Sequence, residues 1–119
     1  MSYVLVIDDD AWQADMLVGQ LTKDGFAAEV VPDALAAFDS IDARRPEAIV
    51  LDIMLPGPNG IAFLHELRSH MDIADIPVVV CSAQHIELSA LRPYGVTAVL
   101  AKETMHPDDI VVAIRKALA

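Results

Sequence analysis

The chain has 119 residues, of which 55% are hydrophobic, and its eight basic and eighteen acidic residues give a formal net charge of −10 at pH 7. This length suits one domain with a core of its own, and the apolar runs are all shorter than the roughly 20 residues of a transmembrane helix. The acidic balance argues against a domain that holds nucleic acid by its phosphates, and it favours a cation ligand or a basic partner. The alternative is that the surplus acid only keeps an apolar domain in solution.

The cysteine content and the N-terminal residues bear on where the protein works. Cys81 is the single cysteine and cannot form a disulfide within the chain, and Met1, Ser2 and Tyr3 show no basic segment typical of a signal peptide. We therefore expect a reducing, cytoplasmic setting and no association with a membrane. One domain is expected over residues 1–119, without an output domain.

Short apolar runs typical of buried strands alternate along the chain with segments whose apolar residues have helical spacing. The first run ends in Asp8, Asp9 and Asp10, and the third ends in Asp52. In chain order, the expected elements are a strand over 3–7, a helix over 11–24, a strand over 27–31, a helix up to 43, a strand over 48–51, a helix over 60–70, a strand over 77–81, a helix over 86–94, a strand over 98–101 and a helix over 107–118.

Cap and stop residues mark the helix boundaries. Gly25 follows the first helix as a C-terminal stop, Asp33 can cap the second, and Pro107 opens the last. The fourth helix is expected to be short, because Pro93 and Gly95 end it. On the second helix, the residues expected to share one face are Leu35, Phe38 and Ile41.

Five strands, each followed by a helix, predict a parallel sheet that is covered on both faces. The near-continuous Val, Ile and Leu of the first, third and fourth strands agree with burial on both sides. The predicted fold class is therefore α/β, a doubly wound sheet of five parallel strands with five helices. Ligands of such sheets bind at the carboxyl ends of the strands.

Polar side chains follow four of the expected strands and would meet at this edge. They are Asp8 and Asp9, Asp52, Ser82 and Lys102. Carboxylate oxygens suit Mg²⁺, a carboxylate can attack phosphorus and form an acyl phosphate, and a metal with an ammonium can neutralise a transferring phosphoryl group. A serine hydroxyl can then hydrogen-bond a phosphoryl oxygen. Each residue alone has an ordinary structural alternative, and only their coincidence at one edge predicts a site.

The order and spacing of these residues resemble those of response-regulator receiver domains over essentially the whole chain. The matching segments are 4–9, 51–56 with Pro56 at its end, 59–60, 78–83 and 99–102. The resemblance implies a flavodoxin-like sheet of strand order 2-1-3-4-5.

The resemblance also implies a role for each site residue. Asp52 would accept a phosphoryl group from a histidine kinase or phosphotransfer protein. Asp9 and Asp52 would bind Mg²⁺ directly together with the backbone carbonyl of Met54, and Asp8 would help through water. The residues implied to contact the phosphoryl group are Ser82 and Lys102.

The neighbouring Asp10 leaves the position of the acidic pair open. The apolar run ends at Ile7, which sets the pair at Asp8 and Asp9 and makes Asp10 an extra acid at the mouth of the site. The alternative is a shift of the pair by one residue.

On this resemblance the chain is a two-component signalling receiver that switches conformation to control an output domain or a downstream protein. It would assist its own phosphorylation without being a turnover enzyme, and a homodimer through its fourth and fifth helices is left open. The main alternative is a pseudo-receiver, an interaction module without phosphorylation switching. A Mg²⁺-dependent phosphohydrolase is disfavoured, because Met54 stands where such enzymes generally have a second acid.

Three features depart from the receiver pattern. Glu103 follows Lys102 where the family usually has a proline, commonly in cis, and a non-proline cis bond costs about 3 kcal/mol, so a trans bond is expected here. Val99 replaces an aromatic residue whose rotation often reports phosphorylation, and Pro93 shortens the fourth helix. These departures concern signal relay more than the acidic site, so phosphoacceptance is expected to be kept.

A few further residues carry separate expectations. Met54 and Gln84 hold positions that tune phosphoryl lifetime in the family, and the apolar Met54 predicts a fairly long-lived phosphorylated form. Trp12 either packs in the first helix or has a functional role, and its fluorescence should report Mg²⁺. Cys81 is expected to pack in the fourth strand. The residues expected at the surface or at helix caps are His65, His70, His85 and His106.

Overall fold

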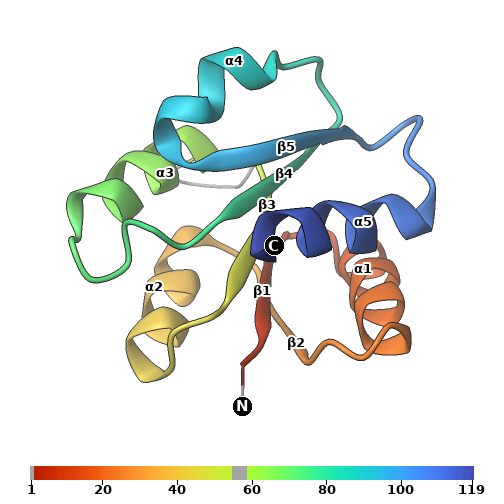
Figure 1. Ribbon diagram of the computed structural model, residues 1–119, viewed down its shortest axis with the longest axis horizontal. Coiled ribbons are helices and arrows are strands. Elements are labelled where there is room, and N and C mark those ends of the chain that lie inside the picture. Colours follow the sequence, from red (N-terminus) through yellow and green to blue (C-terminus); the bar gives the residue numbers. More distant parts are fainter. Residues whose placement is uncertain (1, 55–58) are drawn as a thin grey trace.

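The computed structural model describes residues 2–54 and 59–119 and contains five parallel strands in the order β2-β1-β3-β4-β5 (Figure 1). The strands are β1 (Val4–Ile7), β2 (Ala28–Val31), β3 (Ala48–Asp52), β4 (Val78–Ser82) and β5 (Val96–Ala101). The helices are α1 (Ala11–Lys23), α2 (Ala34–Ala43), α3 (Gly60–Ser69), α4 (Leu88–Leu91), the 3-10 helix η1 (Arg92–Tyr94) and α5 (Pro107–Leu118). The predicted fold class and strand order are confirmed, while Pro56, which ends the segment 51–56 of the receiver pattern, lies outside the described residues.

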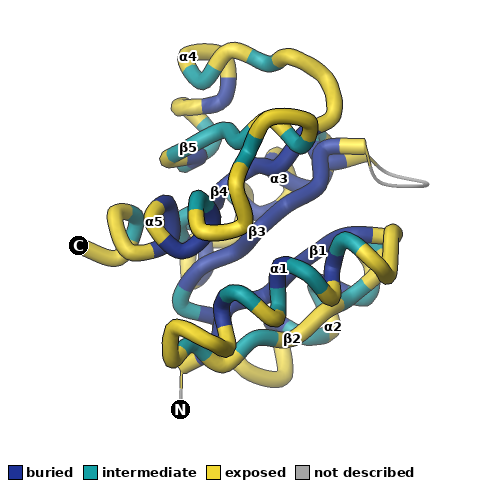
Figure 2. The backbone as a smooth tube through the Cα atoms, turned by 90° about the vertical axis from the view of Figure 1, so that its right-hand side faces the viewer, coloured by how far each residue is buried: buried dark blue, intermediate teal, exposed yellow. Residues whose placement is uncertain are grey.

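Helices cover both faces of the sheet. Alternate residues of each strand point to opposite faces, so that Leu5 and Ile7 pack with the α2, α3 and α4 layer, whereas Val4 and Val6 pack with α1 and α5. Every residue of β1, β3 and β4 is buried (Figure 2). The two edge strands β2 and β5 are only partly buried, as the weaker apolar character of the second strand suggests.

The fourth helical segment differs from the expected helix over 86–94. Only Leu88–Leu91 is α-helical, and Arg92–Tyr94 continues as a 3-10 turn, because Pro93 has no amide hydrogen to extend the α-helix. Gly95 then adopts a φ of +81°, which favours glycine, and β5 begins directly after it at Val96. The strand therefore starts two residues earlier than the expected strand over 98–101.

The predicted buried face of α2 is wrong at one position. Leu35 is 77% exposed, whereas Ala34, Ala37 and Ile41 face the core. Ala34, Ala37 and Ile41 have the spacing of one helical face, which begins one residue before Leu35. Because two small alanines rather than the larger leucine face the core, α2 can lie close to the sheet. Phe38 lies at the margin of this face, and its ring centroid is 5.0 Å from that of Phe63.

Candidate functional site

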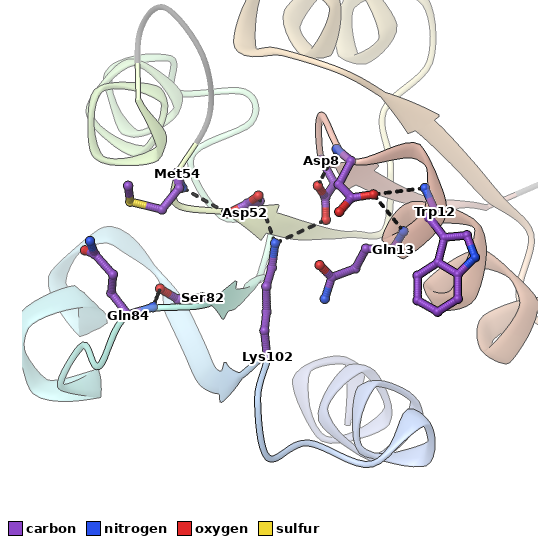
Figure 3. A network of polar contacts seen from close by, with 9 residues as sticks. Asp8, Trp12, Gln13, Asp52, Met54, Ser82, Gln84 and Lys102 are labelled. Atoms are coloured by element: carbon purple, nitrogen blue, oxygen red, sulfur yellow. Dashed lines mark hydrogen bonds and ion pairs between the residues drawn. The ribbon is translucent and has the colours of Figure 1, made fainter.

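Three carboxylates meet at the carboxyl ends of two neighbouring strands. Asp8 and Asp9 follow β1, Asp52 is the last residue of β3, and carboxylate oxygens of the three lie within 4.8 Å of one another. Figure 3 shows Asp8 and Asp52 on either side of the Lys102 ammonium. Asp8 is 3% exposed and Asp52 is 5% exposed, while Asp9 faces solvent. Buried like charges this close destabilise a fold unless cations compensate them, so this arrangement is chemically suited to a cation.

Asp52 is held from two sides. Its Oδ1 accepts a hydrogen bond of 2.9 Å from the backbone amide of Met54, and its Oδ2 accepts one of 2.9 Å from the ammonium of Lys102. The same Lys102 ammonium lies 3.6 Å from Oδ2 of Asp8. Burial lowers the pKa of Lys102, but the hydrogen bond to Asp52 and the charges of Asp8 and Asp52 outweigh this and raise its pKa above the usual value. The ammonium is thus firmly charged and shared between two acids.

Asp8 has one satisfied and one unsatisfied oxygen. Its Oδ1 accepts a hydrogen bond of 2.9 Å from the amide of Asp10, whereas its buried Oδ2 has no hydrogen-bond partner among the described residues. Burial raises the pKa of Asp8 above its ordinary value, and the nearby charges of Asp52 and Asp9 act in the same direction. A buried carboxylate oxygen that lacks a donor and faces other carboxylates fits a site for a hard divalent cation.

Asp10 has a different task from the other acids. It is the N-cap of α1, where its Oδ1 accepts hydrogen bonds from the amides of Trp12 at 3.0 Å and Gln13 at 3.2 Å. Such a cap stabilises a helix by about 1 kcal/mol. The acid that the sequence leaves ambiguous therefore has a structural role at the start of α1.

Ser82 and Lys102 lie at the ends of adjacent strands. Ser82 is the last residue of β4 and is buried, and its Oγ accepts a hydrogen bond of 3.1 Å from the amide of Gln84. The backbone amide of Lys102 donates to the carbonyl of Ser82 at 2.9 Å, which fixes the position of Lys102 just past β5. The Lys102–Glu103 peptide bond is trans, as expected, since no cis bond occurs in the described ranges 2–54 and 59–119.

The remaining candidate residues divide into buried and exposed groups. Cys81 is buried in β4, as expected, and burial raises the pKa of its thiol to about 12. The indole of Trp12 is 81% exposed, so the interpretation of Trp12 as a packing residue is wrong. The histidines expected at the surface or at caps are all exposed, and two of them are caps: His65, His70, His85 and His106.

Two features of the site have no clear signal in the sequence. The first is the pairing of Lys102 with both Asp8 and Asp52, because nothing in the residue spacing gives the direction of a lysine side chain. The second is the unsatisfied Oδ2 of Asp8. None of the helices in the described part of the chain is long and apolar enough to cross a membrane.

A doubly wound parallel sheet with acids, a hydroxyl and a lysine at its carboxyl edge defines the receiver class of signalling domains, and the comparisons with known proteins agree. Residues 4–115 match the family of response regulator receiver domains. The chain belongs to this family and is a receiver domain of two-component signalling.

Two relatives of this chain are response regulators that are longer than the chain itself. The chain is 37% identical over 81 residues to the response regulator MprA of Mycobacterium avium (strain 104), covering 68% of this chain and 35% of MprA. It is 38% identical over 81 residues to the DNA-binding response regulator MtrA of Mycolicibacterium paratuberculosis, again covering 68% of this chain and 35% of the relative. The matched region is thus about a third of the length of these relatives.

Solved structures share the fold. NtrX from Brucella abortus, solved with ADP, has a TM-score of 0.84 and 30% identity, covering 99% of this chain and 26% of NtrX. The chemotaxis response regulator CheY4 of Vibrio cholerae has a TM-score of 0.88 at 21% identity, covering 99% of both chains. The likeness to CheY4 concerns the fold alone.

Proposed function

We propose that Asp52 accepts a phosphoryl group from a phosphohistidine of a histidine kinase or phosphotransfer protein in the cytoplasm, in a reaction that requires Mg²⁺. The phosphorylated domain then controls an output domain or a downstream protein. The observation that carries the proposal is the position of Asp52, which lies between the Lys102 ammonium at 2.9 Å and the carboxylates of Asp8 and Asp9.

The acidic cluster supports a Mg²⁺ site. The residues that would hold the ion are Asp9 and Asp52, with the backbone carbonyl of Met54, and Asp8 would contribute through water. The fit rests on the three hard carboxylates and on the buried Oδ2 of Asp8, which has no hydrogen-bond partner among the described residues. When bound, Mg²⁺ neutralises negative charge on the oxygens of the transferring phosphoryl group.

Asp52 supplies the nucleophile. One carboxylate oxygen of Asp52 attacks the phosphorus, the P–N bond to the donor imidazole breaks, and its electron pair stays on the imidazole nitrogen. The product is an acyl phosphate on Asp52. Because Met54 N–H holds Oδ1 and Lys102 lies on the side of Oδ2, the carboxylate is fixed in one orientation before the donor arrives.

Lys102 and Ser82 are proposed to stabilise the phosphorylated form. The Lys102 ammonium has three donors and can bind a phosphoryl oxygen while it remains near Asp52 and Asp8. The hydroxyl of Ser82 accepts from Gln84 N–H, so its own hydrogen is free to be donated to a phosphoryl oxygen. Such a bond would draw the segment after β4 toward Asp52 and thereby change the surface that a partner reads.

The domain is not proposed to be a turnover enzyme, because each transfer occupies the single nucleophile Asp52. A pseudo-receiver would need none of these contacts, and the complete set of Asp8, Asp9, Asp52, Ser82 and Lys102 disfavours it. Direct binding of nucleic acid by this domain is disfavoured by the net charge of −10.

The test is phosphorylation by small donors. The protein is incubated with acetyl phosphate or phosphoramidate and Mg²⁺, and its intact mass is recorded beside Asp52→Asn and the matched control Asp15→Asn, which changes an exposed acid of α1. We expect one phosphoryl adduct on the wild type and the control, and none on Asp52→Asn or in EDTA. An adduct that persists on Asp52→Asn, or a wild type that neither donor modifies and whose Trp12 fluorescence does not respond to Mg²⁺, would contradict the proposal.

A further inference from the structure

The helices α2 and α3 lie side by side on one face of the sheet, opposite α1 and α5 (Figure 1). A hollow of about 320 Å³ opens to solvent between α2 and α3. Its lining residues are all apolar except the last of these: Ala34, Leu35, Phe38, Ala62, Phe63 and Glu66. None of them belongs to the site at Asp52, so phosphoryl transfer gives this hollow no role.

Small residues on the two facing helices leave room for the hollow. The side chains of Ala34 on α2 and Ala62 on α3 are single methyl groups beside much larger rings. The rings of Phe38 and Phe63 contact each other across the two helices, with centroids 5.0 Å apart. Because Phe63 is buried and Phe38 is half-buried, these rings form an aromatic floor beneath an open mouth. An apolar hollow with a polar group at its rim is the usual form of a binding site.

A large apolar side chain stands at the rim of the hollow. Leu35, in the first turn of α2, is 77% exposed, whereas the residues of this helix that pack on the sheet are Ala34, Ala37 and Ile41. The leucine therefore contributes little to the core of the domain. An exposed apolar side chain that continues an apolar hollow is typical of a surface that a partner covers.

Acidic side chains continue the same faces of the two helices. Asp39 and Asp42 follow Leu35 on α2 at spacings of four and seven residues, and Glu66 follows Ala62 on α3 at a spacing of four. Residues at these spacings share one face of a helix. All three acids are exposed, and α2 contains neither lysine nor arginine. The apolar hollow is therefore flanked by negative charge.

The cations closest in sequence to these acids have other partners. Arg68, the one lysine or arginine of α3, donates hydrogen bonds to three backbone carbonyls. Arg44 and Arg45, which follow α2, each pair with an acid outside the two helices. His70 Nε2 lies 3.5 Å from a carboxylate oxygen of Glu66, but both side chains are about half exposed, and such a solvated pair is weak. The acids beside the hollow thus stay available to a cationic partner.

We propose that the hollow between α2 and α3 receives the apolar face of an amphipathic helix of a partner protein, whose lysine or arginine side chains lie beside Asp39 and Glu66. Apolar anchors at spacings of three and four residues enter grooves of this kind. Their burial against Leu35 and the phenylalanine floor supplies affinity, and the acids select a basic flank. This interaction goes beyond phosphoryl transfer and does not use Asp52.

Other occupants fit the same surface less well. Two copies of the chain face to face would bring together Asp39, Asp42 and Glu66 of both, and like charges across an interface oppose association. An anionic lipid surface is repelled by the same acids. A small apolar molecule would fill the hollow without using the acids at all. The combination of apolar lining and acidic flanks therefore favours a basic amphipathic helix.

The test uses three synthetic peptides and the protein without a phosphodonor. Two peptides are amphipathic helices with leucines at i, i+3, i+4 and i+7, flanked by lysines in one and by glutamates in the other. The third has the composition of the lysine peptide in an order that removes the apolar face. Fluorescence anisotropy of the labelled peptides measures binding. At low salt we expect the lysine peptide to bind about tenfold more tightly, or more, than either of the others.

Variants locate the contacts that this binding uses. Leu35→Ala should weaken binding of the lysine peptide about tenfold, and Glu66→Gln should reduce the preference for lysines over glutamates. The matched controls are Val112→Ala, which shortens a 49% exposed side chain of α5, and Asp15→Asn, which neutralises an exposed acid of α1. Both controls lie on helices of the other face of the sheet and should bind the lysine peptide like the wild type.

Backbone amide chemical shifts show where the peptide lies. We expect the largest changes within α2 and α3, and changes confined to α1 and α5 would overturn the proposal. It is also overturned if the lysine peptide binds no better than the reordered one, or if Leu35→Ala keeps the wild-type affinity. A concentration-dependent dimer that Leu35→Ala abolishes would assign the hollow to a second copy and would likewise overturn it. Phosphorylation of Asp52 is measured separately, so failure here leaves the proposed function untouched.

Discussion

The ammonium of Lys102 lies 2.9 Å from Oδ2 of Asp52 and so joins the ends of two strands that are not neighbours, β3 and β5. It also reaches Asp8, after β1, at 3.6 Å. One side chain thereby links the carboxyl ends of three strands. Since the Lys102 side chain is 14% exposed and the two carboxyl groups are more deeply buried, this link acts largely out of solvent.

Removal of this ammonium is expected to destabilise the domain. In Lys102→Gln the buried carboxylates lose their cation, and we expect the free energy of unfolding without Mg²⁺ to fall by about 3 kcal/mol. The raised pKa of Lys102 means that its contribution is present at neutral pH and is lost only as the pH rises through that raised value. Urea denaturation at pH 7 measures the change.

The matched control is Arg115→Gln, which breaks the exposed ion pair between Arg115 and Asp24. This pair is solvated, so its loss should cost less than about 1 kcal/mol. If the free energy of unfolding falls equally in the two variants, the buried ion pair of Lys102 stabilises the domain no more than the exposed pair of Arg115 does. Mg²⁺ should stabilise Lys102→Gln more than the wild type, because it supplies the positive charge that the variant lacks.

Asp8 is expected to destabilise the fold in the absence of metal and to be required for the stabilising effect of Mg²⁺. Its pKa is raised in the folded protein, even with Lys102 nearby, so the fold disfavours the charged form. Stability therefore falls as the pH rises from the ordinary value of 3.8 through the raised pKa, and the full penalty is present above that raised pKa. In Asp8→Asn we expect unfolding without Mg²⁺ to require about 1 kcal/mol more, and the stabilisation by Mg²⁺ to disappear.

Thermal unfolding with and without Mg²⁺ between acid and neutral pH tests this. The gain of Asp8→Asn should shrink as the pH falls through the raised pKa and vanish below the ordinary value of 3.8, where the wild-type carboxyl is protonated in both states. Asp10→Asn is the control with the same charge change, and asparagine caps a helix as well as aspartate does. A stabilisation of equal size in Asp10→Asn would attribute the effect to general charge rather than to the buried Oδ2 of Asp8.

The strand and helix pattern was predictable because buried parallel strands are continuous apolar runs, and the strand order followed from the resemblance of Asp8, Asp52 and Lys102 to the receiver pattern. Boundaries were less predictable, since the hydrogen bonds of a strand continue into polar residues. Asp52 and Ser82 are the last residues of β3 and β4, so each strand extends one residue beyond the apolar run that predicts it.

The face of α2 and the extent of α4 depended on packing that residue patterns do not contain. Leu35 was placed on the apolar face of α2 because it is large and apolar. The helix instead lies close to the sheet, and the small Ala34 and Ala37 occupy the buried positions. The position of Pro93 correctly predicted a short helix. The division of this helical segment into α4 and η1 depends on local hydrogen bonds that the residue pattern does not contain. In the site, the residue types were predictable, whereas the partners of Lys102 required the side-chain positions.

Two glycines are expected to respond to alanine in opposite directions. A Cβ on Gly60, the first residue of α3, would lie 2.6 Å from the Cα of Ile53, next to Asp52, and backbone atoms cannot move aside easily. We expect Gly60→Ala to cost about 2–4 kcal/mol. Gly19 lies inside α1 with nothing within 4 Å of such a Cβ, so Gly19→Ala should stabilise by about 0.5–1 kcal/mol. Urea denaturation of both variants checks the opposite signs.

The last prediction concerns the lifetime of the phosphorylated form. Met54 lies two residues after Asp52, its amide holds Oδ1 of that carboxylate, and its side chain is about half exposed. A thioether is a weak acceptor that orients water poorly, so the acyl phosphate should hydrolyse slowly in the wild type. The side-chain amide that Met54→Asn introduces can position a water near the phosphorus, and we expect dephosphorylation to be about tenfold faster. The decay of the intact-mass adduct measures the half-life, and Met71→Asn, a change at an exposed and remote methionine, should leave it unaltered. An unchanged half-life in Met54→Asn would show that the side chain at this position does not control access of water to Asp52.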